Sequence, residues 1–229
     1  MTTKDYDPER QILIRSLIAP FFVLVLMWII FAVDQIFNLD LGQYGIVPLT
    51  PMGLIGIITS PLLHANLAHI AANSIPFLLL FAGLFYYYND LAWKIISLSW
   101  LLTGIGVWCF ARGESSHIGA SGVIYALALF HFVSGIIRKN NRLAAFSLLV
   151  TFLYGSLVWG IFPNFLLKEN ISWESHLMGG VSGIILALYY RHEGPYADKY
   201  NIDEEEEFEE DDDDDGEWRV IDDQTDEEK

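Results

Sequence analysis

Two residues able to perform nucleophilic catalysis, Ser121 and His176, each open an apolar stretch of this chain. Ser121 has Gly119 two residues before it and Gly122 directly after it. An imidazole in contact with a hydroxyl takes its proton and later returns it to a leaving group, so a Ser–His pair is the minimum for nucleophilic catalysis. The residue types therefore indicate hydrolytic chemistry, provided that the fold brings Ser121 and His176 together.

Further polar residues lie at helical spacing in the same stretches. His69 and Asn73 are four residues apart, so on a helix they share one face. Tyr125 follows Ser121 by four residues, which places its phenol one turn from the hydroxyl. His64 precedes His69 by five residues and projects differently. Ionisable groups in membrane segments are costly and mark functional sites by default, so these side chains are candidates for one site.

The segments that must position these residues are unusually apolar. The chain has 229 residues, 53% of them hydrophobic, yet its formal net charge is −16. The charge is segregated, since residues 193–229 contain 20 acidic and 3 basic residues and carry −17. We predict three parts: a cytoplasmic N-terminal segment (1–10), a membrane domain (11–192) and a disordered acidic cytoplasmic tail (193–229).

Six apolar runs divide the membrane domain. A spanning helix needs roughly 20 apolar residues, so the sequence predicts an all-α polytopic membrane protein with a bundle of six transmembrane helices. A connection at 34–60 has an apolar middle, Met52 to Thr59, that we expect in the membrane interface. Pro76 interrupts the second run. The predicted spans are Ile12–Val33, Leu62–Tyr86, Leu91–Phe110, Gly119–Ile137, Leu143–Phe162 and Ile171–Tyr190.

Basic residues predict the orientation of the spans. Six spans put both termini on one side, and Lys and Arg accumulate in cytoplasmic loops. With the termini inside, nine basic residues lie in inner loops and only Arg112 and Lys168 lie in outer loops. We therefore expect cytoplasmic termini, candidate site residues near the outer surface, and a location in a bacterial plasma membrane.

Small residues indicate how two of the spans meet. Gly179 and Gly183 are four residues apart in the sixth span, and Gly122 and Ala126 have the same spacing in the fourth. Such stripes let two helix backbones approach closely within a membrane. The fourth and sixth spans are therefore expected to pack tightly, which would bring the serine and the histidine at their outer ends into contact.

In these residues the chain resembles the rhomboid family of intramembrane serine proteases. The resemblance covers about residues 10–192 and places three motifs on the second, fourth and sixth spans, in that order. The motifs are His64-x-x-x-x-His69-x-x-x-Asn73, Gly119-Ala120-Ser121-Gly122 with Tyr125, and His176-x-x-Gly179-x-x-x-Gly183-x-x-x-Ala187.

The resemblance implies a catalytic dyad, with Ser121 as the nucleophile and His176 as general base and acid. Tyr125 would stack on the imidazole and hold its orientation. His69 and Asn73, together with the backbone N–H of Ser121, would form an oxyanion hole, in which donors fixed in a water-poor site stabilise developing charge.

The same resemblance implies the remaining roles and partners. His64 would support the outer cap of the site, and Gly119 would keep the approach to the serine open for the substrate backbone. The substrates would be single-span membrane proteins within the lipid bilayer, cleaved without a metal or other cofactor and without a nucleic acid partner. The oligomeric state is left open.

The chain departs from the family pattern in two places. Many rhomboids carry a Trp-Arg pair in the first outer connection, where this chain has Ile55 and Gly56. An acidic residue near the inner end of the second span is also missing around Phe85 and Tyr86. Both features are mainly architectural in the family, so these departures concern the packing of the connection rather than the chemistry.

Other readings remain open at this point. A rhomboid-like scaffold would bind membrane helices without cleaving them, and a transporter would show inverted repeats with midplane charges, which the sequence lacks. Taken alone, the glycines around Ser121 more often serve helix packing, and His117 is more often a loop residue than a catalytic one. The sequence contains neither a His-Glu-x-x-His motif nor a cysteine cluster for zinc.

Overall fold

The computed structural model describes residues 8–113, 116–153 and 172–194. Within these ranges the chain is helical, and its one β feature is an isolated antiparallel bridge between Ile46 and His117. The all-α class is thus confirmed for the described residues. The elements are α1 (Pro8–Phe37), η1 (Leu41–Tyr44), α2 (Gly53–Thr59), η2 (Ser60–Leu62), α3 (Leu67–Tyr88), α4 (Ala92–Phe110), α5 (Ser121–Ile137), α6 (Asn141–Leu153) and α8 (Trp173–Tyr189).

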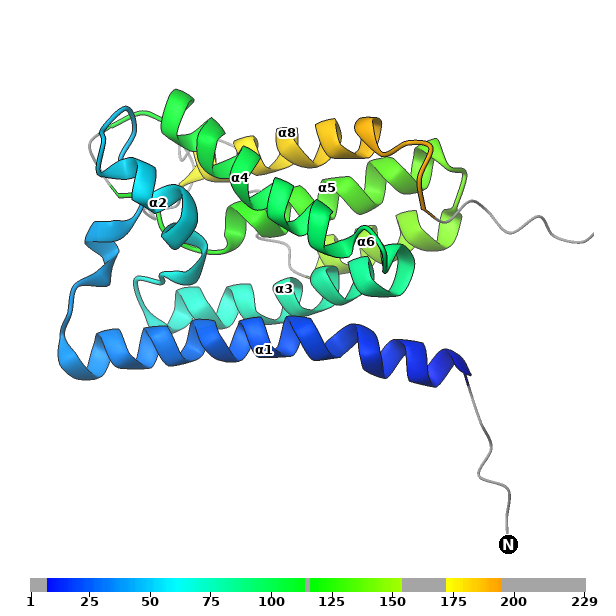
Figure 1. Ribbon diagram of the computed structural model, residues 1–229, viewed down its shortest axis with the longest axis horizontal. Helices are drawn as coiled ribbons and strands as arrows, with labels where there is room; N and C mark the ends of the chain where they lie inside the picture. The colour runs from blue at the N-terminus through cyan, green and yellow to red at the C-terminus, as the bar shows by residue number, and fades with distance from the viewer. Residues whose placement is uncertain (1–7, 114–115, 154–171, 195–229) are drawn as a thin grey trace, which may run out of the picture. The chain divides into compact units, whose positions relative to one another are not determined.

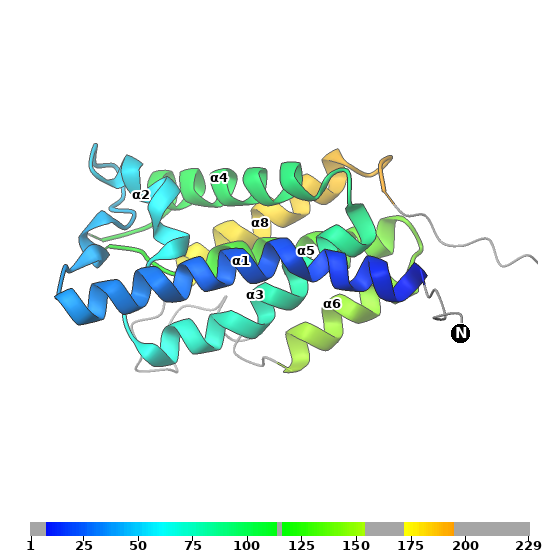
Figure 2. The same ribbon diagram turned by 60° about the horizontal axis from the view of Figure 1, so that its bottom comes forward.

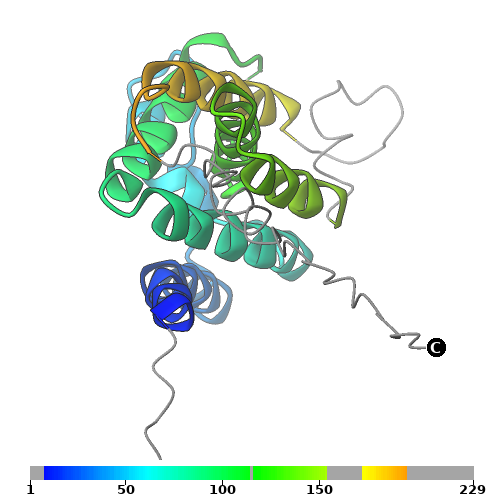
Figure 3. The same ribbon diagram turned by 90° about the vertical axis from the view of Figure 1, so that its right-hand side faces the viewer.

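The long helices run along a common direction, as the side view and the end view show (Figures 1 and 3). Helix α1 lies at the edge of the bundle against α3. In the turned view it passes across the front of the bundle (Figure 2). Trp28 on α1 donates its indole N–H to the Ser74 hydroxyl on α3 at 3.0 Å. Helix α5 packs most extensively against α8, so the helices expected to carry the serine and the histidine form the centre of the fold.

Three of the described helices, α1, α3 and α4, are long and apolar enough to cross a membrane. Helices α5 and α8 have 17 residues each, at the lower limit for a span. Helix α6 has 13 residues, and the remainder of the predicted fifth span, to Phe162, lies outside the described residues. The six-span count therefore stays a prediction, as does the acidic tail, of which only residues 193 and 194 are described.

The predicted second span begins too early. Helix α3 starts at Leu67 because Asn66 caps it, its side-chain oxygen accepting from the His69 N–H at 2.9 Å. His64 therefore lies in the loop before the helix rather than on it. Helix α3 also continues through Pro76 without a break, which is common in membrane helices, where neighbouring groups satisfy the freed carbonyl.

Helix α1 is longer than the apolar run Ile12–Val33 that predicted it. It begins at Pro8, a residue favoured in the first helical turn because its missing N–H is not needed there. It ends at Phe37, beyond Asp34, whose carboxylate accepts from the Leu41 N–H at 3.0 Å. Polar residues at both ends thus extend the helix, which hydrophobicity alone does not reveal.

Two tryptophans of α4 hold the connection between α1 and α3. Trp100 donates its indole N–H to the carbonyl of Ile57 at 3.0 Å, and Trp108 donates to the carbonyl of Thr50 at 2.8 Å. Both bonds join side chains of a long helix to backbone oxygens in and before α2. The connection is therefore anchored from α4.

The absence of a Trp-Arg pair at residues 55 and 56 has a packing reason. Gly56 of α2 lies against the backbone of Gly45, and a Cβ built on it would approach the Gly45 oxygen to 2.3 Å. An arginine at this position requires the connection to move. Ile55 beside it is 48% exposed. In place of a Trp-Arg pair at 55 and 56, the connection has the close backbone contact of Gly56 with Gly45 and the hydrogen bonds from the two α4 indoles.

Helices α5 and α8 touch backbone to backbone. A Cβ built on Gly179 would lie 2.0 Å from the Gly122 oxygen, and one on Gly183 would lie 2.1 Å from the Ala126 oxygen. Real Cβ atoms do not approach oxygen so closely, so these positions require glycine. The close approach expected from the small-residue stripes is present, and it sets how α5 and α8 are aligned along one another.

Candidate active site

Three of the predicted site residues lie at helix N-termini. Ser121 is the first residue of α5, His176 lies in the first turn of α8, and His69 lies in the first turn of α3. These three helix starts lie at the end of the bundle where α2 is found (Figure 1). The first N–H groups of a helix have no intrahelical acceptor and create a positive potential, so this end suits an oxyanion.

Ser121 and His176 form a hydrogen-bonded pair. The Nε2 atom of His176 lies 2.9 Å from the Ser121 Oγ, a distance suited to proton transfer. The Tyr125 ring stacks on the imidazole, with centroids 4.3 Å apart and planes inclined by 18°. His176 is buried, with 6% of its surface exposed. The stacked phenol and the burial leave the imidazole little freedom to turn away from the serine.

His69 and Asn73 lie against Gly119, two residues before the serine. A Cβ built on Gly119 would lie 2.6 Å from His69 Nε2 and 3.6 Å from Asn73 Nδ2. Gly119 also has a φ of 114°, a conformation that favours glycine, and its N–H donates to the Ser60 carbonyl at 2.8 Å. The glycine is therefore needed twice, for its backbone conformation and for the space that the imidazole occupies.

His64 orients Asn73 from the loop before α3. Its Nε2 lies 3.1 Å from Asn73 Nδ2, and its ring centroid is 5.0 Å from that of His69. Burial, followed by the neighbouring His69, lowers the pKa of His64 to about 4. The ring is therefore neutral at neutral pH, and because an amide nitrogen only donates, Nε2 accepts and the proton of His64 sits on Nδ1.

The sequence did not single out two further residues that lie beside the site. Ser172 caps α8, its side chain accepting from the Ser175 N–H, and a serine directly before an apolar periodic run is a recognisable helix start. Ser60 contributes only its backbone carbonyl, for which no sequence pattern exists. Within the described ranges, no group of three or more His, Cys, Asp and Glu side chains is placed to hold a metal ion.

Comparison with known proteins bears on the family of the chain. The family model described as Rhomboid domain matches residues 51–193, which is more than half of the chain and contains all three motifs. Uncharacterized protein Rv1337 of Mycobacterium tuberculosis is 35% identical over 172 residues, covering 71% of this chain and 70% of the relative. Uncharacterized protein ML1171 of Mycobacterium leprae is 30% identical over 174 residues, covering 72% and 67%.

Proposed function

The chain belongs to the rhomboid family, and on this premise we propose that it is an intramembrane serine endopeptidase that cleaves single-span membrane proteins. It is an integral membrane protein, as its apolar helices α1, α3 and α4 and its rhomboid domain indicate. The observation that carries the proposal is the 2.9 Å contact between His176 Nε2 and Ser121 Oγ. A nucleophile and a base in contact at the ends of two tightly packed helices have the arrangement that acyl transfer needs.

The proposed reaction begins at the contact between His176 and Ser121. His176 Nε2 takes the Ser121 hydroxyl proton while the oxygen attacks the scissile carbonyl, which gives a tetrahedral oxyanion. The intermediate collapses, the peptide C–N bond breaks, and the imidazolium gives its proton to the leaving amine. Water then attacks the acyl-enzyme with the same imidazole as base. The peptide is hydrolysed, and both Ser121 and His176 return to their starting protonation states.

The oxyanion would be bound by donors from two helices. The N–H of Ser121, at the start of α5, has no intrahelical acceptor, and the His69 imidazole and Asn73 amide lie against Gly119 two residues away. His64 accepts one hydrogen of the Asn73 amide and so directs the other. Removal of one oxyanion donor typically costs about 100- to 1,000-fold in kcat, so each side chain is expected to matter.

We expect the substrate to be a membrane-spanning helix that unwinds locally. A peptide bond inside a helix is hydrogen-bonded and shielded by side chains, so a membrane substrate must unwind locally before Ser121 can attack it. Small or helix-destabilising residues are therefore expected near the cleaved bond. With nine basic residues in inner loops against two in outer loops, the site faces the outer side of the membrane and both termini are cytoplasmic.

The test uses the full chain reconstituted in liposomes with a fluorescent single-span substrate and EDTA throughout. Wild type is compared with Ser121→Ala and His176→Ala, and with Ser182→Ala as a matched control, because the Ser182 hydroxyl donates to the Met178 carbonyl of its own helix. We expect cleavage by wild type and the control alone. Binding of the substrate helix without cleavage by any protein would instead indicate a rhomboid-like scaffold.

A further inference from the structure

The position of His176 depends on the first turn of α8. Helix α8 begins at Trp173, so the imidazole stands only three residues into it. First-turn N–H groups lack intrahelical acceptors, and helix ends fray. Here the Ser172 carbonyl accepts from the His176 N–H at 3.4 Å, and the Ser172 hydroxyl accepts from the Ser175 N–H at 3.3 Å. Any movement of this cap moves the base relative to Ser121.

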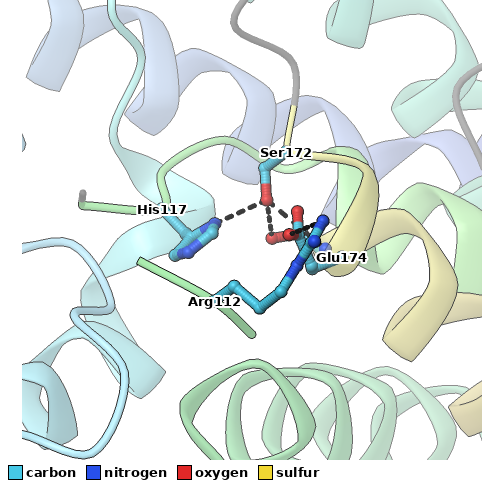
Figure 4. Close-up of polar contacts among 5 residues, drawn as sticks. Arg112, His117, Ser172 and Glu174 are labelled. Atoms are coloured by element: carbon cyan, nitrogen blue, oxygen red, sulfur yellow. Dashed lines mark hydrogen bonds and ion pairs between the residues drawn. The ribbon is translucent and has the colours of Figure 1, made fainter. Parts of the chain in front are cut away.

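The imidazole of His117 holds the hydroxyl of this cap. His117 Nδ1 lies 2.6 Å from Ser172 Oγ, which also lies 2.6 Å from Ser175 Oγ (Figure 4). A hydroxyl donates one hydrogen bond and accepts two. The contacts with the imidazole, the Ser175 N–H and the Ser175 hydroxyl therefore use its full capacity. The cap is held at one place by a residue outside α8.

His117 is itself fixed on the serine side of the site. Its side chain is buried, and its backbone forms both hydrogen bonds of the bridge with Ile46, at 2.8 and 3.0 Å. Two residues later, Gly119 donates to the Ser60 carbonyl. Burial lowers the pKa of His117, against a smaller rise caused by Glu174, so the ring is neutral at neutral pH.

The other contacts between the two segments restrain the first turn of α8 less directly. A Cβ built on Gly122 of α5 would lie 3.1 Å from the Ser175 oxygen in the first turn, whereas the tightest contact, 2.0 Å, is at Gly179, almost one turn after His176. Arg112 pairs with Glu174 at 3.4 Å and stands over the Trp173 ring, but the Arg112 side chain is 72% exposed. Exposed ion pairs contribute little. The contact between His117 and the cap is the short, largely buried link.

We propose that His117 is a positioning residue: it fixes the Ser172 cap of α8 and thereby sets the distance from the His176 imidazole to Ser121. The inference rests on the proposed function for its effect on catalysis. The path it describes is short, running from Ser121 back four residues to His117, across to Ser172, and on to His176. Both members of the dyad are thus tied to one another outside their own hydrogen bond.

The kinetic test compares His117→Leu, which removes the ring nitrogen, with His117→Asn, whose amide stands near the place of Nδ1. A displacement of about 1 Å at a catalytic group lowers the rate by up to about 100-fold. We therefore expect His117→Leu to lower kcat by about 10- to 100-fold, with KM changed less than about two-fold. His117→Asn should restore most of kcat, Ser172→Ala should resemble His117→Leu, and Arg112→Ala should stay near wild type.

A second measurement does not need activity. Hydrogen exchange of the amides at Ser175 and His176 should be faster in His117→Leu than in wild type, while amides within α4 exchange at the same rate in both. Unchanged exchange together with an unchanged kcat would overturn the proposal. So would a loss of kcat that Asn does not restore and that follows the melting temperature.

Failure of the proposed function has a different signature. If wild type neither cleaves substrate nor reacts with a serine-directed phosphonate, the protease assignment fails. Exchange at Ser175 and His176 then decides alone whether His117 fixes the cap of α8.

Discussion

Helix α8 is held at its two ends by different chemistry. At its start, the buried contacts join imidazoles to hydroxyls, His117 to Ser172 and His176 to Ser121, and the largely exposed Arg112 pairs with Glu174 beside them. At its other end a buried cation is used. The guanidinium of Arg138, at the end of α5, donates to the carbonyl oxygens of Tyr190 and Glu193 as well as to the Ser134 hydroxyl.

The end of α8 near Arg138 is suited to holding the helix in place. The last carbonyls of a helix lack donors and carry negative potential, so a buried arginine there satisfies both needs. Arg138 Nε also donates to Ser134 Oγ at 3.1 Å, Tyr88 donates its hydroxyl to the same oxygen at 2.8 Å, and the guanidinium stands 5.6 Å from the Tyr88 ring. Several charge-assisted contacts converge on one residue.

The start of α8, around His117 and His176, is suited to the charges that form and disappear during the proposed reaction. In the proposed reaction an oxyanion and an imidazolium form together beside Ser121, and a neutral surrounding of hydroxyls, amides and imidazoles adjusts its hydrogen bonds to both. The comparison therefore indicates a division of labour along α8, with stability supplied mainly at Arg138 and geometry supplied at His117.

The largest effect is expected where both ends are disturbed together. Gly179→Ala places a methyl group about where the Gly122 oxygen stands, which forces α5 and α8 apart. We expect a loss of cleavage of more than about 10-fold and a destabilisation of about 1–3 kcal/mol, as overpacking causes. Gly180→Ala is the matched control, because its methyl meets only the end of the Leu129 side chain at 3.2 Å. Equal losses in both variants would contradict the backbone contact.

The next effect separates stability from catalysis. Arg138→Met leaves buried carbonyls without a donor, which costs about 1–3 kcal/mol and should lower the melting temperature by several degrees. The kcat value should stay within about three-fold of wild type, because Arg138 is at the other end of α8. Lys139→Met, at the exposed neighbouring position, controls for the loss of one charge. A large fall in kcat with unchanged stability would reverse the proposed division of labour.

Acidification should lower the stability of the site around His64. His64 has a folded-state pKa of about 4, below its usual 6.5, so between these values the unfolded chain binds more protons and stability falls as pH falls. His64→Gln keeps an amide near the place of Nε2 and does not titrate. Thermal unfolding of wild type should therefore lose more stability between pH 7 and pH 5 than this variant. Identical pH dependence would show that His64 is not buried neutral.

The smallest change in stability is expected for the ion pair at the start of α8. Arg112, whose side chain is 72% exposed, pairs at 3.4 Å with Glu174, whose side chain is 14% exposed, and ion pairs with such a solvent-exposed partner contribute about 0–1 kcal/mol. Arg112→Ala should change the melting temperature by no more than about 2 °C, and the difference should vanish at high salt. A change as large as that in Arg138→Met would remove the distinction between anchoring and peripheral charges.

Much of the site follows from the sequence because membrane helices impose fixed spacing. The predicted pairing of the serine and histidine segments depends on the stripe at Gly179 and Gly183, and the structure has the two backbones in contact there. The candidates His69 and Asn73 are expected on one face, and both lie against Gly119. Periodicity and small residues carry this information directly.

Other features depend on contacts that leave no local pattern. The loop position of His64 follows from the cap at Asn66, which the long apolar run conceals. The link between His117 and Ser172 joins residues 55 positions apart through common polar side chains. The anchoring of the first connection by Trp100 and Trp108 uses backbone acceptors, which any sequence supplies.

The central claim is that His176 activates Ser121 as a nucleophile, and a covalent label tests it most directly. The full chain in detergent would be treated with a fluorophosphonate, digested and analysed by mass spectrometry for the modified serine. The account predicts one adduct, on Ser121, formed at least about 100-fold more slowly in His176→Ala and absent from Ser121→Ala. An adduct on another serine, or equal labelling of His176→Ala and wild type, would contradict it.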